Sequence, residues 1–80
     1  MDRSELLKTV QDIFRDILDD EEIVLEDSTT ADDVEGWDSL THIQLIVAIE
    51  KSFGIKFTSL EIMKWRNVGE MVNSTEEKLK

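Results

Sequence analysis

Apolar side chains recur at spacings of three and four residues in the first part of the chain, and polar side chains fill the positions between them. The apolar positions are Leu6, Leu7, Val10, Ile13, Phe14, Ile17 and Leu18. One apolar face opposite one polar face is the pattern of an amphipathic helix. We therefore expect a first helix over roughly residues 4–18.

A second helical pattern opens at Asp38 or Ser39 and runs to Phe53. Gly54 suits the left-handed residue that often follows a helix. The positions expected to face the core are Leu45, Ile46, Ile49 and Phe53. Another side of the helix is also apolar, at Leu40, Ile43 and Val47. Either this helix presents a surface to a partner, or the other helices wrap around it.

Capping patterns predict two more helices. Thr58 followed by Glu61 starts a short helix over residues 59–65. Asn67 followed by Glu70 starts a last helix, from about residue 68 into the high seventies. The expected fold class is all-α: a small four-helix bundle of three longer helices and one short helix, with a long loop between the first two.

The loop of residues 19–38 has no helical period. Loops of this length are uncommon in compact domains and are usually functional. The apolar residues that we expect to pin it to the core are Ile23, Val24, Leu25 and Val34. Ten acidic residues and no Lys or Arg lie in this loop, whereas the other sixty residues carry nine acids and nine bases. The whole net charge of −10 therefore lies in the segment that leads to Ser39.

Composition limits the function further. The 80 residues suffice for one small core, so we expect a single domain over residues 1–80. The chain has no cysteine, which excludes a disulfide, a cysteine metal site and a protein thiol nucleophile. The net negative charge argues against binding to nucleic acid, which requires a basic face. No signal-peptide pattern and no apolar run of membrane-spanning length is present, so we expect a cytoplasmic protein with no membrane span.

Ser39 lies in the first turn of the expected second helix. Unpaired backbone N–H groups and the positive end of the helix dipole favour an anion there, so a serine that carries a phosphodiester is one hypothesis. A hydrolytic site is an alternative, because Asp38, Ser39 and His42 are close in sequence and look like triad members. Against it, no third group is placed to orient the imidazole, and the Gly-x-Ser-x-Gly turn of α/β-hydrolases is absent.

An acidic loop that contains a glycine also suggests a calcium site of the EF-hand type. Placing Gly36 at the sixth loop position puts Ala31 first and His42 twelfth, where an aspartate and a glutamate are required. We therefore predict no specific metal site, and we expect the acids to bind divalent cations weakly.

The order of these features resembles the acyl and peptidyl carrier protein family. The shared features are the amphipathic first helix, the acidic loop, the motif Asp38-Ser39-Leu40, an apolar second helix that ends in Glu50-Lys51-Ser52-Phe53-Gly54, a short third helix and a capped fourth helix. In that family the serine of the motif carries 4′-phosphopantetheine, which a separate transferase attaches from coenzyme A. The resemblance implies that Ser39 is the attachment residue. It also implies that the protein is not an enzyme but presents acyl or aminoacyl thioesters to other enzymes.

The resemblance also assigns roles to neighbouring residues. The positions that match the family's partner-facing surface are Leu40, Ile43 and Val47. The expected partners are the phosphopantetheinyl transferase and the enzymes that load and process the acyl or aminoacyl group. Asp38 belongs to the motif and suits a helix N-cap. His42 either donates a hydrogen bond to the phosphodiester or is a solvated surface imidazole, and Trp37 either anchors the loop or contacts a partner.

The second helix departs from many carriers of fatty acid synthesis, which present several acids along it. Gln44 and Lys51 stand at the matching positions here, and Glu50 is the only acid of this helix after Asp38. Fatty acid, polyketide, peptide and D-alanyl carriers share the architecture, so the pathway stays open. The rival hypothesis is an unmodified acidic helical domain that binds another protein through its second helix. We expect a monomer in either case.

Overall fold

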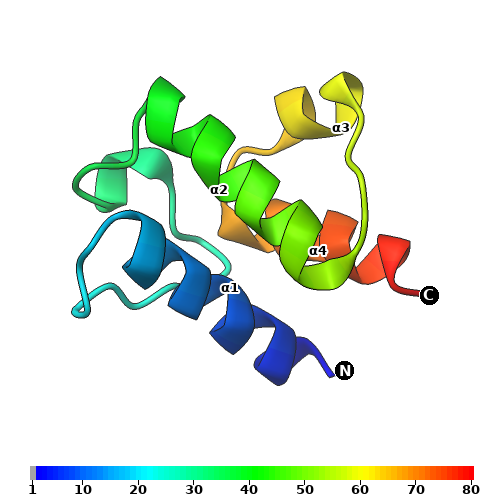
Figure 1. The fold of residues 1–80 in the computed structure, drawn as a ribbon, viewed down its shortest axis with the longest axis horizontal. Coiled ribbons are helices and arrows are strands. Elements are labelled where there is room, and N and C mark those ends of the chain that lie inside the picture. The colour runs from blue at the N-terminus through cyan, green and yellow to red at the C-terminus, as the bar shows by residue number, and fades with distance from the viewer. Residues whose placement is uncertain (1) are drawn as a thin grey trace.

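The computed structural model describes residues 2–80, and all of its regular structure is helical (Figure 1). The α-helices are α1 (Arg3–Ile17), α2 (Ser39–Phe53), α3 (Ser59–Lys64) and α4 (Val68–Lys78), and a 3-10 turn, η1 (Ala31–Asp33), lies in the loop after α1. The prediction of an all-α bundle with three longer helices and one short helix is confirmed. Within residues 2–80, no helix is long and apolar enough to cross a membrane.

A local cap sets where α1 begins, and the spacing of its apolar residues sets which face is buried. The side chain of Asp2 accepts a hydrogen bond of 2.9 Å from the backbone N–H of Glu5, which satisfies one of the unpaired donors at the helix start. Leu6, Val10 and Phe14 point into the core and are fully buried. The helix matches the predicted range to within one residue at each end.

The core lies between α1, α2 and α4. Leu45 and Ile49 of α2 have no exposed surface, and both α2 and α4 pack against α1 (Figure 1). The core residues are Leu6, Val10, Phe14, Ile23, Leu25, Val34, Leu45, Ile49, Val68, Met71 and Val72. This packing brings the start of α2 close to the link between α3 and α4.

The predicted ends of the later helices are confirmed to within one residue. α2 is followed by Gly54, whose φ of 67° is the left-handed conformation that glycine adopts without strain. Thr58 and Glu61 form the reciprocal capping box that starts α3. Asn67 accepts a hydrogen bond of 2.9 Å from the N–H of Glu70 and starts α4.

The loop between α1 and α2 is pinned by three of the four predicted side chains. Ile23, Leu25 and Val34 are buried. The prediction for Val24 is wrong, because its side chain is 67% exposed. Ile23 and Leu25 on either side of it are both buried, so the side chain between them is left facing outward.

Two side chains of α1 hold the backbone of this loop. Arg15 Nε donates a hydrogen bond of 2.7 Å to the carbonyl oxygen of Ile23. Gln11 Oε1 accepts one of 3.0 Å from the N–H of Leu25. The loop backbone is therefore paired on the side where its apolar residues enter the core.

The first N–H groups of α4 hold the loop from another direction. The N–H of Val68 donates to the carbonyl oxygen of Thr29, and the N–H of Gly69 donates to that of Asp27, both at 2.8 Å. These donors have no partner within their own helix. The loop therefore caps α4 while α4 positions the loop.

Gly69 allows this close approach. A Cβ atom at position 69 would lie 2.8 Å from the carbonyl oxygen of Asp27. We predict that Gly69→Ala lowers the free energy of unfolding by about 1–3 kcal/mol, the usual cost of overpacking, as measured by urea denaturation. Gly54→Asn is the control, because asparagine tolerates the left-handed conformation and a Cβ there meets no other part of the molecule within 4 Å. Equal stability of Gly69→Ala and the native protein would contradict the proposed contact.

Candidate functional site

Ser39 is the first residue of α2, and its side chain is exposed. Asp38 is the N-cap, and its Oδ1 accepts hydrogen bonds of 3.0 Å from the N–H groups of Leu40 and Thr41. Thr41 Oγ1 in turn accepts a hydrogen bond of 2.8 Å from the N–H of Asp38. None of the hydrogen bonds found among residues 2–80 uses the hydroxyl of Ser39. The helix start is therefore built without that hydroxyl, which is left available for chemistry.

The expectation that unpaired N–H groups at this helix start would receive an anion is wrong for two of those groups. The carboxylate of Asp38 already pairs with the N–H groups of Leu40 and Thr41. The hydrogen bond from the Thr41 backbone lowers the pKa of Asp38 below its ordinary value, so this carboxyl is charged at neutral pH. An anion on Ser39 therefore meets the helix dipole beside an existing negative charge.

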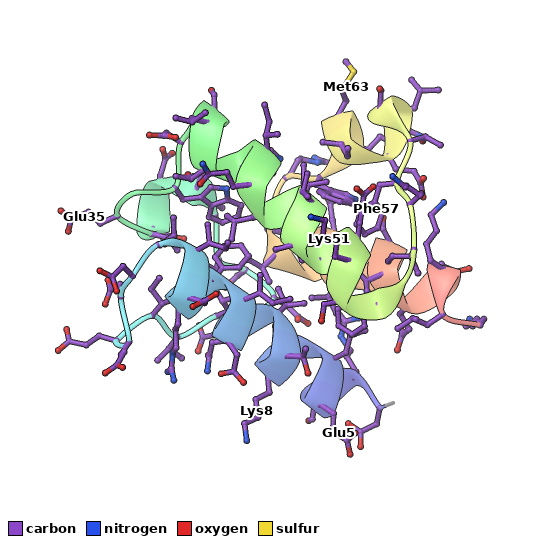
Figure 2. All side chains as sticks on the ribbon, in the orientation of Figure 1. Glu5, Lys8, Glu35, Lys51, Phe57 and Met63 are labelled. Atoms are coloured by element: carbon purple, nitrogen blue, oxygen red, sulfur yellow. The ribbon has the colours of Figure 1, made fainter. Side chains whose placement is uncertain are left out.

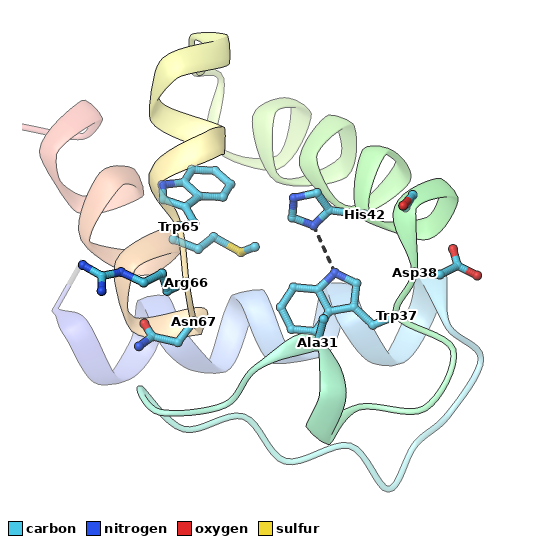
Figure 3. Close-up of a pocket in the computed structure, with 9 residues that line it drawn as sticks. Ala31, Trp37, Asp38, His42, Trp65, Arg66 and Asn67 are labelled. Atoms are coloured by element: carbon cyan, nitrogen blue, oxygen red, sulfur yellow. Dashed lines mark hydrogen bonds between the residues drawn. The ribbon is translucent and has the colours of Figure 1, made fainter.

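Trp37 ties the start of α2 to α1. Its indole ring packs edge-on against Phe14, with 4.8 Å between ring centroids and 89° between planes. Its Nε1–H donates a hydrogen bond of 3.0 Å to Nδ1 of His42 (Figure 3). The structure thus gives Trp37 the anchoring role, and the contact with a partner stays a prediction.

His42 lies one helical turn after Ser39 with its ring half-buried. The ring stacks on Trp37 at 5.9 Å and meets Trp65 edge-on at 6.5 Å. The interpretation as a fully solvated surface imidazole is therefore wrong, because the half-buried ring lies beside two tryptophan rings. Burial lowers the pKa of His42 below its usual value, so the neutral ring is favoured. A hydrogen bond from His42 to a phosphodiester stays a prediction.

A cavity of about 370 Å³ lies between the start of α2 and the link from α3 to α4 (Figure 3). It is lined by Ala31, Trp37, Asp38, Ser39, His42, Trp65, Arg66, Asn67 and Met71. This cavity was not predicted from the sequence, because Trp65 and Asn67 are far from Ser39 along the chain. The sequence signal for this cavity was Trp65, a large aromatic residue at the junction of the two capped helices α3 and α4.

The apolar side chains of α2 that were predicted to face partners are exposed. We call Leu40, Ile43 and Val47 the apolar face; their side chains are 68%, 61% and 42% exposed. Exposed apolar side chains that cluster on one helix indicate a binding surface. The short helix α3 adds Leu60 and Met63, and Figure 2 shows Met63 projecting outward from it. The exposure of Leu60 and Met63 was not predicted, because a six-residue helix is too short to show a period.

The residues near Ser39 do not have the geometry of a hydrolytic triad or of a metal site. Nδ1 of His42 is occupied by Trp37, and the carboxylate of Asp38 is occupied by backbone N–H groups, so the two do not form a relay to Ser39. In the part of the chain that the structure describes, no three His, Cys, Asp or Glu side chains lie close enough together to hold a metal ion.

Comparisons with known proteins decide the family. The family model described as a phosphopantetheine attachment site matches residues 8–74. An acyl carrier protein of Petrotoga mobilis is 37% identical in an alignment of 81 positions, which covers 99% of this chain and 93% of that protein. The chain belongs to the acyl carrier protein family. A second acyl carrier protein, of Thermotoga maritima, is 35% identical over 96% of this chain and 95% of its own length.

A solved structure agrees with this family. The solution NMR structure of holo acyl carrier protein from Geobacter metallireducens is 42% identical in sequence and has a TM-score of 0.88, over 92% of this chain and 85% of that one. The predicted family and fold are therefore confirmed, as are the role as a carrier that is not an enzyme and the 4′-phosphopantetheine cofactor. The residues at the start of α2 fit that cofactor, because an exposed and unused hydroxyl lies at the wall of a cavity.

The surroundings of His42 predict that stability depends on pH. Folding lowers the pKa of His42, so the unfolded chain takes up a proton first as the pH falls. The contribution of the neutral His42 ring to folding stability is complete above the pKa of the unfolded chain, about 6.5. It is lost as the pH falls from there through the lower pKa of the folded protein. We predict that the Tm of the native protein falls more steeply from about pH 7.5 to pH 5 than that of His42→Gln, whose amide does not titrate but still accepts the indole hydrogen bond. Parallel Tm curves would contradict this prediction.

Proposed function

We propose that Ser39 carries 4′-phosphopantetheine and that the protein presents acyl or aminoacyl groups, held as thioesters on that arm, to the enzymes of a biosynthetic pathway. The observation that carries the proposal is the hydroxyl of Ser39, which is exposed and makes no hydrogen bond among residues 2–80. It also stands between Asp38 and Leu40, in the motif of the family. The arm supplies a thiol to a chain that has no cysteine.

The residues on either side of Ser39 hold it in position. Asp38 and Thr41 fix the backbone on both sides of the serine through their reciprocal hydrogen bonds. This leaves Ser39 at a defined position, since the first turn of α2 is capped rather than frayed. A transferase therefore meets a serine whose backbone position is set before binding and whose hydroxyl has no competing partner among residues 2–80.

Charge and apolar contact come from different parts of the molecule. Glu50, the only acid of α2, accepts a hydrogen bond of 2.8 Å from the N–H of Phe57 and is thus used within the fold. The acids of residues 19–38 lie on the other side of Ser39 along the chain. We infer that the loop attracts basic partners at long range and that the apolar face makes the short-range contact.

The partners in this proposal are the phosphopantetheinyl transferase and the enzymes that load and process the acyl or aminoacyl group. They meet Trp37 and the apolar face, where large side chains can enter pockets of the partner. In this proposal the protein acts as a monomer. It acts in the cytoplasm, because a reducing compartment keeps the terminal thiol of the arm from forming disulfides.

Intact mass spectrometry tests the attachment residue. Incubation with coenzyme A and a phosphopantetheinyl transferase of broad specificity is predicted to add one phosphopantetheinyl group to the native protein and none to Ser39→Ala. Ser59→Ala is the matched control and keeps the adduct, because Ser59 is also the exposed first residue of a capped helix. The rival hypothesis, an unmodified acidic interaction domain, predicts no adduct on any of the three proteins. An adduct that persists on Ser39→Ala would refute the assignment of the residue.

The kinetics of the same transferase test the apolar face. Ile43→Ser is predicted to raise the KM for the carrier roughly fivefold, because truncation of an apolar interface contact costs about 1 kcal/mol. Val24→Ser is the matched control, since Val24 is similarly exposed, at 67% against 61% for Ile43, but lies in the loop. Both variants are expected to keep the native Tm, because neither side chain is part of the core. Equal KM values for the two variants would remove Ile43 from the docking surface.

A further inference from the structure

The charge of α2 and α3 differs in sign from that of the loop before them. From the start of α2 to the end of α3, residues 39–64 carry three lysines and two acids. Residues 19–38 carry ten acids and no Lys or Arg. The chain therefore changes from strongly acidic to slightly basic at Ser39, and a partner that covers both segments meets that change of sign.

Both acids of α2 and α3 have partners within the protein. Glu50 Oε2 accepts a hydrogen bond of 2.8 Å from the N–H of Phe57. Glu61 Oε1 lies 2.9 Å from Nζ of Lys78, so this carboxylate is turned toward α4. The charged groups that α2 and α3 present to another molecule are therefore their lysines.

The three lysines of this stretch are available for contact. Lys51, Lys56 and Lys64 are exposed, and none of them forms an ion pair among residues 2–80. Lys56 lies in the link between the two helices. A surface ammonium group without a carboxylate of its own can pair with one that a partner supplies, and the fold loses no ion pair when it does so.

Two of these lysines extend apolar rows. Lys51 follows Val47 by four residues, which places it one turn further along the apolar face of α2. On α3, Leu60 is followed by Met63 and Lys64 at spacings of three and four residues, so all three side chains share one side of the helix. All five side chains are exposed. Each helix thus presents an apolar row that ends in a lysine.

The link between the helices holds the two rows in a fixed relation. The N–H of Phe57 is bound to Glu50 near the end of α2, and the Phe57 ring packs edge-on against Trp65, just after α3, at 4.8 Å. Figure 2 shows Phe57 between α2 and α3, with Lys51 on α2 and Met63 at the outer end of α3. The two helices therefore offer one surface whose parts are positioned before a partner arrives.

We propose that α2 and α3 bind a partner protein whose apolar socket is bordered by carboxylates, and that Lys51 and Lys64 pair with those carboxylates. The proposal rests on the proposed function, because this partner is one of the enzymes to which the carrier presents its thioester. Such a partner is basic where it meets the acidic loop and acidic where it meets α3. The lysines therefore select among enzymes, since a surface that is basic throughout is repelled at α3.

An anionic membrane is the other surface that suits exposed apolar side chains together with lysines. The ten acids of residues 19–38 oppose it, because a membrane presents the same negative charge to the loop as to α3. A protein surface avoids this conflict, since its charges differ from one place to the next. The observations therefore favour a protein partner.

Peptides with the same apolar row test the sign of the partner. Three amphipathic peptides of about 15 residues, long enough to form a helix, would carry one leucine row flanked by Glu, Gln or Lys. Each would be titrated into the ¹⁵N-labelled protein at 0.15 M salt, where charges interact over about 8 Å. We expect the Glu-flanked peptide to shift the amide signals of Lys51, Met63 and Lys64 and to bind there roughly threefold more tightly than the Gln-flanked peptide.

The other outcomes contradict specific parts of the proposal. A Gln- or Lys-flanked peptide that binds α2 and α3 as tightly as the Glu-flanked one would overturn it, as would the absence of shifts there with every peptide. Phosphatidylserine vesicles that shift the same signals would assign the surface to a membrane instead. The titration uses the unmodified protein, so a failure of Ser39 to accept the arm would refute the proposed function without changing the peptide result.

Charge reversal at one lysine tests whether the contact is local. Lys64→Glu is predicted to weaken binding of the Glu-flanked peptide roughly twofold to fivefold more than Lys8→Glu does. Lys8 is the matched control, because it is also exposed and forms no ion pair among residues 2–80, and both substitutions change the net charge equally. Figure 2 shows Lys8 on α1, at the opposite edge of the molecule from Met63.

Equal weakening by the two substitutions would show that only the total charge matters and would overturn the role of Lys64. Both variants are expected to keep the native Tm, because neither lysine belongs to the core. A Tm for each variant shows that it is folded.

Discussion

The packing of the Trp37 indole is the contact on which the site depends. The ring lies against Phe14 of α1 and donates its only polar hydrogen to His42 of α2, so it joins two helices and the loop between them. Because Trp37 stands two residues before Ser39, its burial fixes where α2 begins relative to α1. The same hydrogen bond sets the neutral tautomer of His42. The Trp37 indole therefore both places the start of α2 against α1 and sets the tautomer of His42.

The acidic loop uses only a few of its charged side chains to hold its shape, among them Asp20, Asp33 and Asp38, which accept backbone hydrogen bonds. Arg3 reaches Asp27 at 3.3 Å, but an exposed ion pair of this kind contributes little to stability. The loop is held instead by Ile23 and Leu25 in the core and by the hydrogen bond from Gly69 to the carbonyl oxygen of Asp27. Since the fold does not depend on most of the acids, their mutual repulsion is tolerated at the surface, and their charge is available for the attraction of partners that we propose.

The helix ends followed from the sequence because each is decided within four residues, as at Thr58 and Asn67. The turn η1 has a similar local signal, Thr30 with Asp33, which was overlooked because it lies in an acidic segment without a period. By contrast, no local pattern shows which of two adjacent loop side chains turns inward, and Val24 was misplaced for that reason. The surroundings of His42 depend on a residue of another segment, Trp65, and only the packed structure reveals them.

Asp38 and Ser39 show why a carrier motif needs two residues with separate tasks. A serine that capped the helix itself would have its hydroxyl tied to backbone N–H groups and would be a poor target for modification. Asp38 takes over that task by accepting the hydrogen bonds of Leu40 and Thr41, which frees the next side chain. With the arm on Ser39, as we propose, the phosphodiester cannot bind these two N–H groups, and the carboxylate of Asp38 lies beside it. An arm with few attractive contacts at its root is free to leave the surface and enter a partner, which is what a carrier requires.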